Sequence, residues 1–221
     1  MTGLGLQLGL HLGLYLVTDS GLAERAGHTL PDLVAAAVAG GVTTVQVREK
    51  ERPAGDFLRT VMEVGEVVPE GVTLLVNDRV DVYLAAREQG APVAGVHVGQ
   101  EDLPAVLVRQ LIGPQAVLGL SAAHPEQLAA AAASPARVDY VGIGVLRATD
   151  TKPDAPAPLG IEGMRERAAR SALPAVAIGG IKVQDAAALA GSALSGVAVV
   201  SGICAAADPR AAAAAYAEVW K

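Results

Sequence analysis

Short apolar segments alternate with longer alanine- and leucine-rich segments along almost the whole chain, and this alternation constrains the fold more than any other feature. Nearly continuous apolar strands are typical of parallel sheets, whose two faces are both covered by helices. The predicted strands are residues 13–18, 43–47, 73–76, 95–98, 116–120, 140–143, 175–178 and 196–200. The predicted helices are residues 30–39, 55–67, 80–88, 103–111, 125–133, 163–171, 184–190 and 209–220.

Eight strand–helix units predict a closed (β/α)8 barrel, the TIM-barrel architecture, formed by residues 1–221 as one domain. An open doubly wound sheet is the alternative architecture. Residues 149–160 follow the sixth predicted strand and contain Pro153, Pro156 and Pro158, which disfavour a helix. This stretch is therefore predicted to be a mobile loop at the active site.

Net charge and composition argue against several classes of binding partner. The formal net charge of −6 offers no global field for DNA, RNA or anionic lipid, so neither nucleic acid nor membrane is an expected partner. Residues 1–12 are apolar but lack the basic start and the cleavage site of a signal peptide, and a cytoplasmic location is expected. The single cysteine, Cys204, excludes an internal disulfide and is predicted to be a small buried side chain.

Polar side chains and glycines follow most of the predicted strands. In strand order they are Gln46, Arg48 and Lys50, then Asn77 and Asp78, Gln100 and Asp102, Ser121, then Thr149, Thr151 and Lys152, Gly179 and Gly180, and Ser201. Enzymes with this barrel carry their chemistry at the carboxyl ends of the strands. The sequence therefore predicts an active site at that end.

Asp78 and Asp102 follow neighbouring strands, and each also precedes a predicted helix. Capping of the helix amides is one explanation for both acids. The other is a metal site, because like charges that lie close together raise each other's proton affinity unless a cation separates them. Mg²⁺ suits such a pair, since it binds through one or two carboxylates and completes its coordination with water and phosphate oxygens.

Cations near this end predict phosphate binding. Arg48 and Lys50 are offset by two residues, so an extended backbone directs them to one side, and Lys152 adds a third charge. A solvated charged loop is the alternative. Backbone amides of the loops at Gly180 and Val200, with the Ser201 hydroxyl, predict a second phosphate site, and the chain has no P-loop motif. Two anion sites imply two phosphorylated small-molecule substrates.

His97 and Ser121 are the remaining polar residues near the strand ends. His97 is predicted to be a hydrogen-bonded interior histidine rather than a general base. Ser121 lies outside any G-x-S-x-G elbow, which argues against acyl-enzyme chemistry, and is predicted to hydrogen-bond a substrate.

Taken together, these motifs resemble those of the thiamine-phosphate synthase family, also called thiamine-phosphate pyrophosphorylases. The resemblance spans most of the chain and rests on the order and spacing of several segments. They are residues 15–19 (YLVTD), 41–50 (GVTTVQVREK), 77–81 (NDRVD), 95–102 (GVHVGQED), 149–152 (TDTK), 178–181 (IGGI) and 199–201 (VVS).

That resemblance implies a (β/α)8 transferase that joins a hydroxymethylpyrimidine diphosphate to hydroxyethylthiazole phosphate, with Mg²⁺ and a dissociative mechanism. The residues implied for the pyrimidine diphosphate are Gln46, Arg48, Glu49, Lys50, Asn77, Ser121 and Lys152. Those implied for the thiazole phosphate are Thr149, Asp150, Thr151, Gly180, Val200 and Ser201. The implied Mg²⁺ ligands are Asp78 and Asp102.

The chain departs from the family pattern at residues 144–149, where GVLRAT replaces a Gly-Pro pair followed by an aromatic residue. Two other functions stay open. One is a thiazole tautomerase with the same barrel, against which Gln46 and Asp102 argue, because a tautomerase has no need of a metal–diphosphate site. The other is a noncatalytic regulator that binds phosphorylated metabolites, and homo-oligomerisation is left open.

Overall fold

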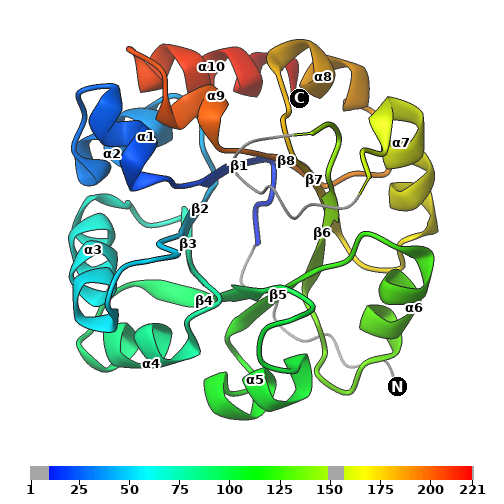
Figure 1. Ribbon diagram of the computed structural model, residues 1–221, viewed down its shortest axis with the longest axis horizontal. Helices are drawn as coiled ribbons and strands as arrows, with labels where there is room; N and C mark the ends of the chain where they lie inside the picture. The colour runs from blue at the N-terminus through cyan, green and yellow to red at the C-terminus, as the bar shows by residue number, and fades with distance from the viewer. Residues whose placement is uncertain (1–9, 149–156, 221) are drawn as a thin grey trace.

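The computed structural model describes residues 10–148 and 157–220, which form a closed parallel barrel with helices on the outside (Figure 1). The strands run around the barrel in sequence order. They are β1 (Leu14–Val17), β2 (Thr44–Val47), β3 (Thr73–Asn77), β4 (Val93–Val98), β5 (Val117–Ser121), β6 (Tyr140–Gly144), β7 (Ala175–Ile178) and β8 (Gly196–Val199). The (β/α)8 prediction is confirmed, and the open sheet is wrong.

The helices largely follow the predicted segments. They are α1 (Ser20–Arg25), α2 (Leu30–Ala39), α3 (Ala54–Val67), α4 (Val80–Glu88), α5 (Ala105–Ile112), α6 (Pro125–Ala133), α7 (Gly160–Arg170), α8 (Val183–Leu189), α9 (Ser201–Cys204) and α10 (Pro209–Val219). The sequence did not predict α1 and α9, because helices of six and four residues are too short to show a 3.6-residue periodicity.

Several predicted boundaries differ from the observed ones by one to three residues, and two of these differences concern the mouth of the barrel. Val200 was assigned to the eighth strand but lies after β8, at the N-cap of α9. Gly160 was assigned to the long loop but begins α7. Of that loop, residues 149–156 lie outside the described part of the chain.

Two apolar clusters hold the barrel together. The larger one fills the layer between strands and helices, and the smaller one lies inside the barrel around Tyr15, Leu75, Tyr140 and Val176. Cys204 is buried in the outer layer, where its thiol donates to the Val17 carbonyl and burial raises its pKa to about 12. Its predicted role as a small buried side chain is confirmed.

Strand register brings polar residues to one level of the barrel. Asn77 of β3 pairs with His97 of β4, His97 pairs with Gly119 of β5, and Gly119 pairs with Tyr140 of β6. Side chains of these residues that point inward therefore lie close together below the carboxyl ends of the strands.

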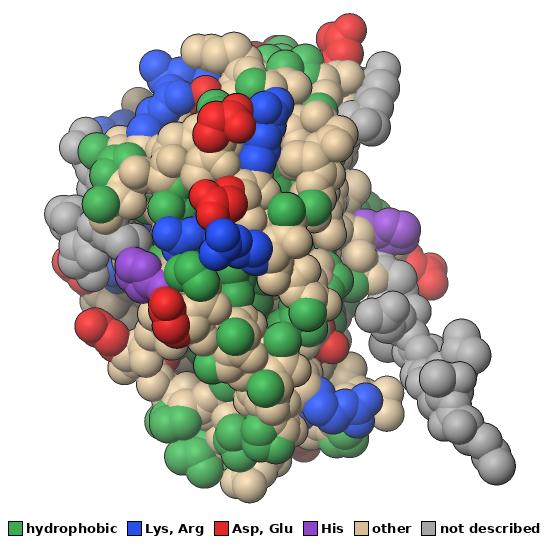
Figure 2. Space-filling view, turned by 90° about the vertical axis from the view of Figure 1, so that its right-hand side faces the viewer, with side chains coloured by type: hydrophobic (Ala, Val, Ile, Leu, Met, Phe, Trp, Pro, Cys, Tyr) green, Lys and Arg blue, Asp and Glu red, His purple; other side chains and the backbone are tan. Residues whose placement is uncertain are grey.

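The outer surface shows mixed charge on the side that carries α7. Basic side chains lie beside acidic ones there rather than forming one basic area (Figure 2), and α7 contributes the ion pairs Arg165–Glu162 and Arg170–Glu166. Within residues 10–148 and 157–220, no helix has the length and apolar character needed to cross a membrane.

Candidate active site

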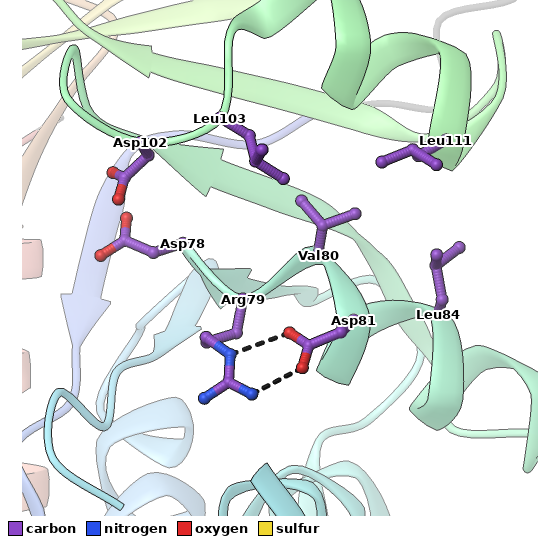
Figure 3. A pocket seen from close by; sticks show the side chains of 8 residues that line it. All are labelled: Asp78, Arg79, Val80, Asp81, Leu84, Asp102, Leu103 and Leu111. Carbon is purple, nitrogen blue, oxygen red and sulfur yellow. Dashed lines mark hydrogen bonds and ion pairs between the residues drawn. The ribbon is translucent and has the colours of Figure 1, made fainter. Parts of the chain in front are cut away.

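The carboxyl groups of Asp78 and Asp102 face one another at the carboxyl end of the barrel (Figure 3). Burial, together with the charge and hydrogen bond of Asp102, raises the pKa of Asp78 to about 6, whereas the nearby Arg48 opposes the shift. The Gly99 N–H donates to Asp102 Oδ2 over 2.7 Å, which fixes one oxygen of that carboxylate. The pair therefore concentrates negative charge at this end of the barrel.

Neither acid caps a helix, so the capping explanation is wrong. The N-cap of α4 is Arg79 and that of α5 is Pro104, and neither end has a side-chain cap. Asp78 has a φ of +57°, a backbone conformation that is uncommon outside glycine. Such conformations cost free energy and cluster at functional sites. The backbone at Asp78 turns its carboxyl toward Asp102 rather than toward the amides of α4.

The donor set at this point fits magnesium better than a metal that needs many protein ligands. In the described part of the chain, no three His, Cys, Asp or Glu side chains gather as they would at a zinc centre. Two carboxylates are enough for Mg²⁺, because water and substrate phosphate oxygens supply the rest of its octahedron.

A cavity of about 400 Å³ adjoins the acid pair. Its other wall is apolar and includes Leu84, Leu103 and Leu111 (Figure 3). Arg79 is bonded to Asp81 through two N–H···O contacts of 2.8 and 2.5 Å. This pair lowers the pKa of Asp81, chiefly through its hydrogen bonds with Arg79, and keeps Asp81 apart from the facing acids.

The loop after β2 carries the predicted cations. The Arg48 N–H donates to Thr18 Oγ1 over 3.0 Å, which ties the loop to the end of β1. Lys50 is exposed. The Glu49 side chain is only 8% exposed, accepts a hydrogen bond from the Ser20 hydroxyl of α1 and pairs with Arg52 at 3.3 Å. Glu49 thus contacts the neighbouring helix and its own loop.

A hydrogen-bonded chain of side chains runs through the barrel below this loop. Gln46 Nε2 donates to the Tyr15 hydroxyl over 2.7 Å, and the Tyr15 and Tyr140 hydroxyls are 2.7 Å apart. His97 Nδ1 lies 2.9 Å from the Tyr140 hydroxyl, and His97 Nε2 lies 3.0 Å from Ser121 Oγ. Burial raises the pKa of both tyrosines, so their hydroxyls stay protonated and the chain is neutral at those points.

This chain confirms His97 as a hydrogen-bonded interior histidine, and it includes Tyr15 and Tyr140, which the sequence reasoning missed. The signal that was available is glycine within a strand, which marks a close approach by another group. A Cβ at Gly119 would lie 2.3 Å from Tyr140 Cζ and 2.4 Å from His97 Nδ1. Gly119 therefore leaves the space in which the two rings meet.

The predicted second phosphate site lies on the opposite side of the barrel mouth, after β7 and β8. Gly180 has a φ of +67°, Val200 is the N-cap of α9, and Ser201 is exposed in its first turn. Thr149, Asp150, Thr151 and Lys152 lie outside the described residues, so the structure does not place them. Asn77 ends β3 directly before the acid pair.

Fold and site together define a (β/α)8 enzyme with an acid pair, a basic loop and a polar interior gathered at the carboxyl ends of its strands. Residues 14–203 match the family model described as thiamine monophosphate synthase. The thiamine-phosphate synthase of Albidiferax ferrireducens is 45% identical over 199 residues, which cover 90% of this chain and 87% of that one. The Corynebacterium efficiens enzyme of the same name is 44% identical, with 90% of each chain covered.

Solved structures agree. A thiamine phosphate pyrophosphorylase from Pyrococcus furiosus superposes with a TM-score of 0.81 at 30% identity over 95% of each chain. A 3-hexulose-6-phosphate synthase reaches a TM-score of 0.66 at 16% identity, which reflects the barrel fold alone. The chain therefore belongs to the thiamine-phosphate synthase family and is a transferase.

Proposed function

We propose that the protein joins 4-amino-2-methyl-5-(diphosphooxymethyl)pyrimidine to hydroxyethylthiazole phosphate, giving thiamine phosphate and diphosphate. Family membership supports the overall reaction. The single observation that carries the assignment of the site is the facing pair of Asp78 and Asp102 beside Arg48. A metal–diphosphate site is the feature that separates a synthase from a barrel that only isomerises or binds a thiazole phosphate.

The diphosphate binds on the side of β2 and β3 in this proposal. Arg48 lies close enough to Asp78 to influence its pKa, and Lys50 is exposed on the same loop. An arginine grips phosphate oxygens with paired N–H groups, while a lysine supplies a mobile point charge. Asp78 and Asp102 hold Mg²⁺, which when bound neutralises diphosphate charge. Asn77 contributes an amide at the end of β3, and Lys152 a further cation.

The reaction follows a dissociative course in this proposal. The bond between the pyrimidine methylene carbon and the diphosphate oxygen breaks first, and the electron pair leaves with diphosphate. The lone pair of the thiazole nitrogen then forms the new carbon–nitrogen bond. Arg48 and Lys50 stabilise the charge that develops on the leaving group, and preorganised charges of this kind commonly supply the largest catalytic contribution. No strong base is needed for the bond-breaking step.

The pyrimidine ring lies over the polar interior in this proposal. Gln46 and Ser121, held by Tyr15 and His97, present fixed hydrogen-bonding groups to it. The thiazole phosphate binds across the mouth, at Gly180, Val200 and Ser201. The resemblance adds Thr149, Asp150 and Thr151 to that site. Both substrates then meet above the strand ends.

The test is a two-substrate assay on the purified protein. With both phosphorylated substrates and Mg²⁺, thiamine phosphate and diphosphate should form in equal amounts, and chelation with EDTA should abolish turnover until Mg²⁺ is restored. Isomerisation of a thiazole phosphate without coupling would replace the proposal with a tautomerase. Binding of the substrates without any turnover would replace it with a regulator.

A further inference from the structure

The segment after β6 lies directly across the loop after β7. The backbone N–H groups of Leu146 and Arg147 donate to the carbonyls of Ile178 and Gly179 over 3.0 and 3.2 Å. Arg147 Nη2 then donates to Asp185 Oδ1 in the first turn of α8 over 2.6 Å. One residue thus links two loops at the mouth of the barrel through both its backbone and its side chain.

The contact with the segment after β6 requires glycine at two positions of the loop after β7. Gly179 and Gly180 have φ values of +101° and +67°, in the region that favours glycine. A Cβ at Gly180 would lie 2.5 Å from Arg147 Cγ, and one at Gly179 would lie 2.5 Å from Val145 Cβ. The aliphatic part of Arg147 therefore lies flat on the Gly180 backbone, in the loop proposed to receive the thiazole phosphate.

Asp185 is a buried carboxylate with both oxygens engaged. Its side chain is 8% exposed, Oδ1 accepts from Arg147, and Oδ2 accepts from the Lys182 N–H over 2.8 Å. On the other side of the loop, the Tyr216 hydroxyl of α10 donates to the Ile181 carbonyl over 2.9 Å. Burial, and after it the Asp185 charge, raises the pKa of Tyr216. Without Arg147, this carboxylate would present an uncompensated negative charge beside the loop.

We propose that Arg147 is a positioning residue for the thiazole-phosphate site, where it neutralises Asp185 and holds the Gly179–Gly180 loop in the shape that accepts a phosphate. The inference rests on the proposed function, because that function puts a phosphate dianion at Gly180.

The electrostatic role makes a distinctive prediction. Arg147→Met keeps most of the side chain's length over Gly180 but removes the charge, so Asp185 repels the incoming phosphate. The KM for the thiazole phosphate should rise about tenfold, while the KM for the pyrimidine diphosphate stays within about twofold. Asp185→Asn retains an acceptor for the Lys182 N–H and removes the repelling charge. The double variant should therefore bind thiazole phosphate within about threefold of the wild type.

The experiment measures both KM values and the calorimetric Kd for thiazole phosphate on six forms: wild type, Arg147→Met, Arg147→Lys, Asp185→Asn, the Arg147→Met/Asp185→Asn double variant and Arg170→Met. Arg147→Lys should recover part of the loss. Arg170→Met is the matched control, because Arg170 pairs with Glu166 on the exposed surface of α7, and it should change neither constant. Thermal melts confirm that each variant folds.

Three outcomes would overturn the inference. They are an unchanged affinity of Arg147→Met for thiazole phosphate, an equal loss of affinity for both substrates, or a double variant that binds thiazole phosphate as weakly as Arg147→Met does. The proposed function fails separately. It fails if the wild type binds thiazole phosphate but forms no thiamine phosphate, and the calorimetric series still tests Arg147 in that case. A wild-type protein that neither binds thiazole phosphate nor forms thiamine phosphate would overturn both the proposed function and the role of Arg147.

Discussion

The Asp78 carboxyl faces the Asp102 carboxyl across the end of β3 and β4, although 23 residues separate them, and each comes from a different loop (Figure 3). The conformation of Asp78, with a φ of +57°, and the Gly99 amide on Asp102 together hold this arrangement. Asp78 is partly buried and Asp102 is exposed, and two like charges that lie this close are unfavourable by themselves. The protein retains them at a cost in stability, which the proposed Mg²⁺ would offset.

Asp102→Asn tests the proposed role of the pair in catalysis. The substitution keeps the size of the side chain and an acceptor for the Gly99 N–H, but it removes one of the two charges that attract Mg²⁺. We expect kcat/KM to fall by about a hundredfold or more, in line with the loss of a charged group that stabilises the transition state. The Mg²⁺ concentration for half-maximal activity should also rise, and a Mg²⁺ titration of steady-state turnover measures both effects.

Asp81→Asn is the matched control for this experiment. Asp81 lines the same cavity, but its carboxylate is bonded to Arg79 through both oxygens. Its loss should leave the Mg²⁺ dependence unchanged and cost at most about 1 kcal/mol of stability, as for other exposed ion pairs. Equal effects of the Asp81 and Asp102 substitutions would remove the facing pair from any special role.

The raised pKa of Asp78 predicts a stability that falls with pH in metal-free protein. Its folded-state pKa of about 6 exceeds the ordinary value of 3.8, so the folded protein binds more protons than the unfolded chain between these values. Stability is therefore present at low pH and is lost as pH rises from about 4 to above 6. Because Asp78 is partly exposed, we expect a loss of about 1 kcal/mol rather than the full value of the shift.

Asp78→Asn removes this contribution. In EDTA the variant should be more stable than the wild type at pH 8 by about 1 kcal/mol and equal to it near pH 4, as measured by urea unfolding. Adding Mg²⁺ should stabilise the wild type and leave the variant nearly unchanged. A variant that is less stable than the wild type at pH 8 in EDTA would contradict the repulsion between the two acids.

Glu49→Ala tests whether this residue acts on the substrate or on its loop. The Glu49 carboxylate joins Ser20 of α1 to Arg52, so its removal frees the loop that carries Arg48 and Lys50. We expect a loss of about 1–2 kcal/mol in unfolding free energy and a KM for the pyrimidine diphosphate that rises more than kcat falls. Glu51→Ala, two residues along and exposed, is the control. A fall in kcat alone, at unchanged stability, would instead place Glu49 in contact with the reacting atoms.

The barrel could be predicted from the sequence, because eight apolar runs, each followed by a helical segment, leave few other ways to bury every strand. The proximity of Asp78 and Asp102 could also be predicted, since the two residues follow neighbouring parallel strands. The sequence did not exclude capping, because that choice depended on the φ of Asp78. Tyr15 and Tyr140 were missed because a tyrosine in a strand reads as core, and the bond between their hydroxyls joins positions 125 residues apart. The structural role of Glu49 could not be predicted, because its hydrogen-bond partner, Ser20 of α1, is distant in sequence.

Gly119→Ala tests whether the meeting of His97 and Tyr140 matters for activity. A methyl group at this position would overlap both rings, so one of them must move and the bond between His97 Nδ1 and the Tyr140 hydroxyl is lost. We expect a destabilisation of about 1–3 kcal/mol, as for other overpacked interiors. Turnover should fall at temperatures where the variant is still fully folded, because Ser121 loses the orientation that His97 gives it.

Gly55→Ala in α3 is the control, since a Cβ there meets nothing within 4 Å and should stabilise the helix by about 0.5–1 kcal/mol. Thermal unfolding followed by kinetics at 25 °C separates the two effects. A folded Gly119→Ala enzyme with unchanged kcat and KM would show that the hydrogen-bonded chain inside the barrel serves packing and not the reaction.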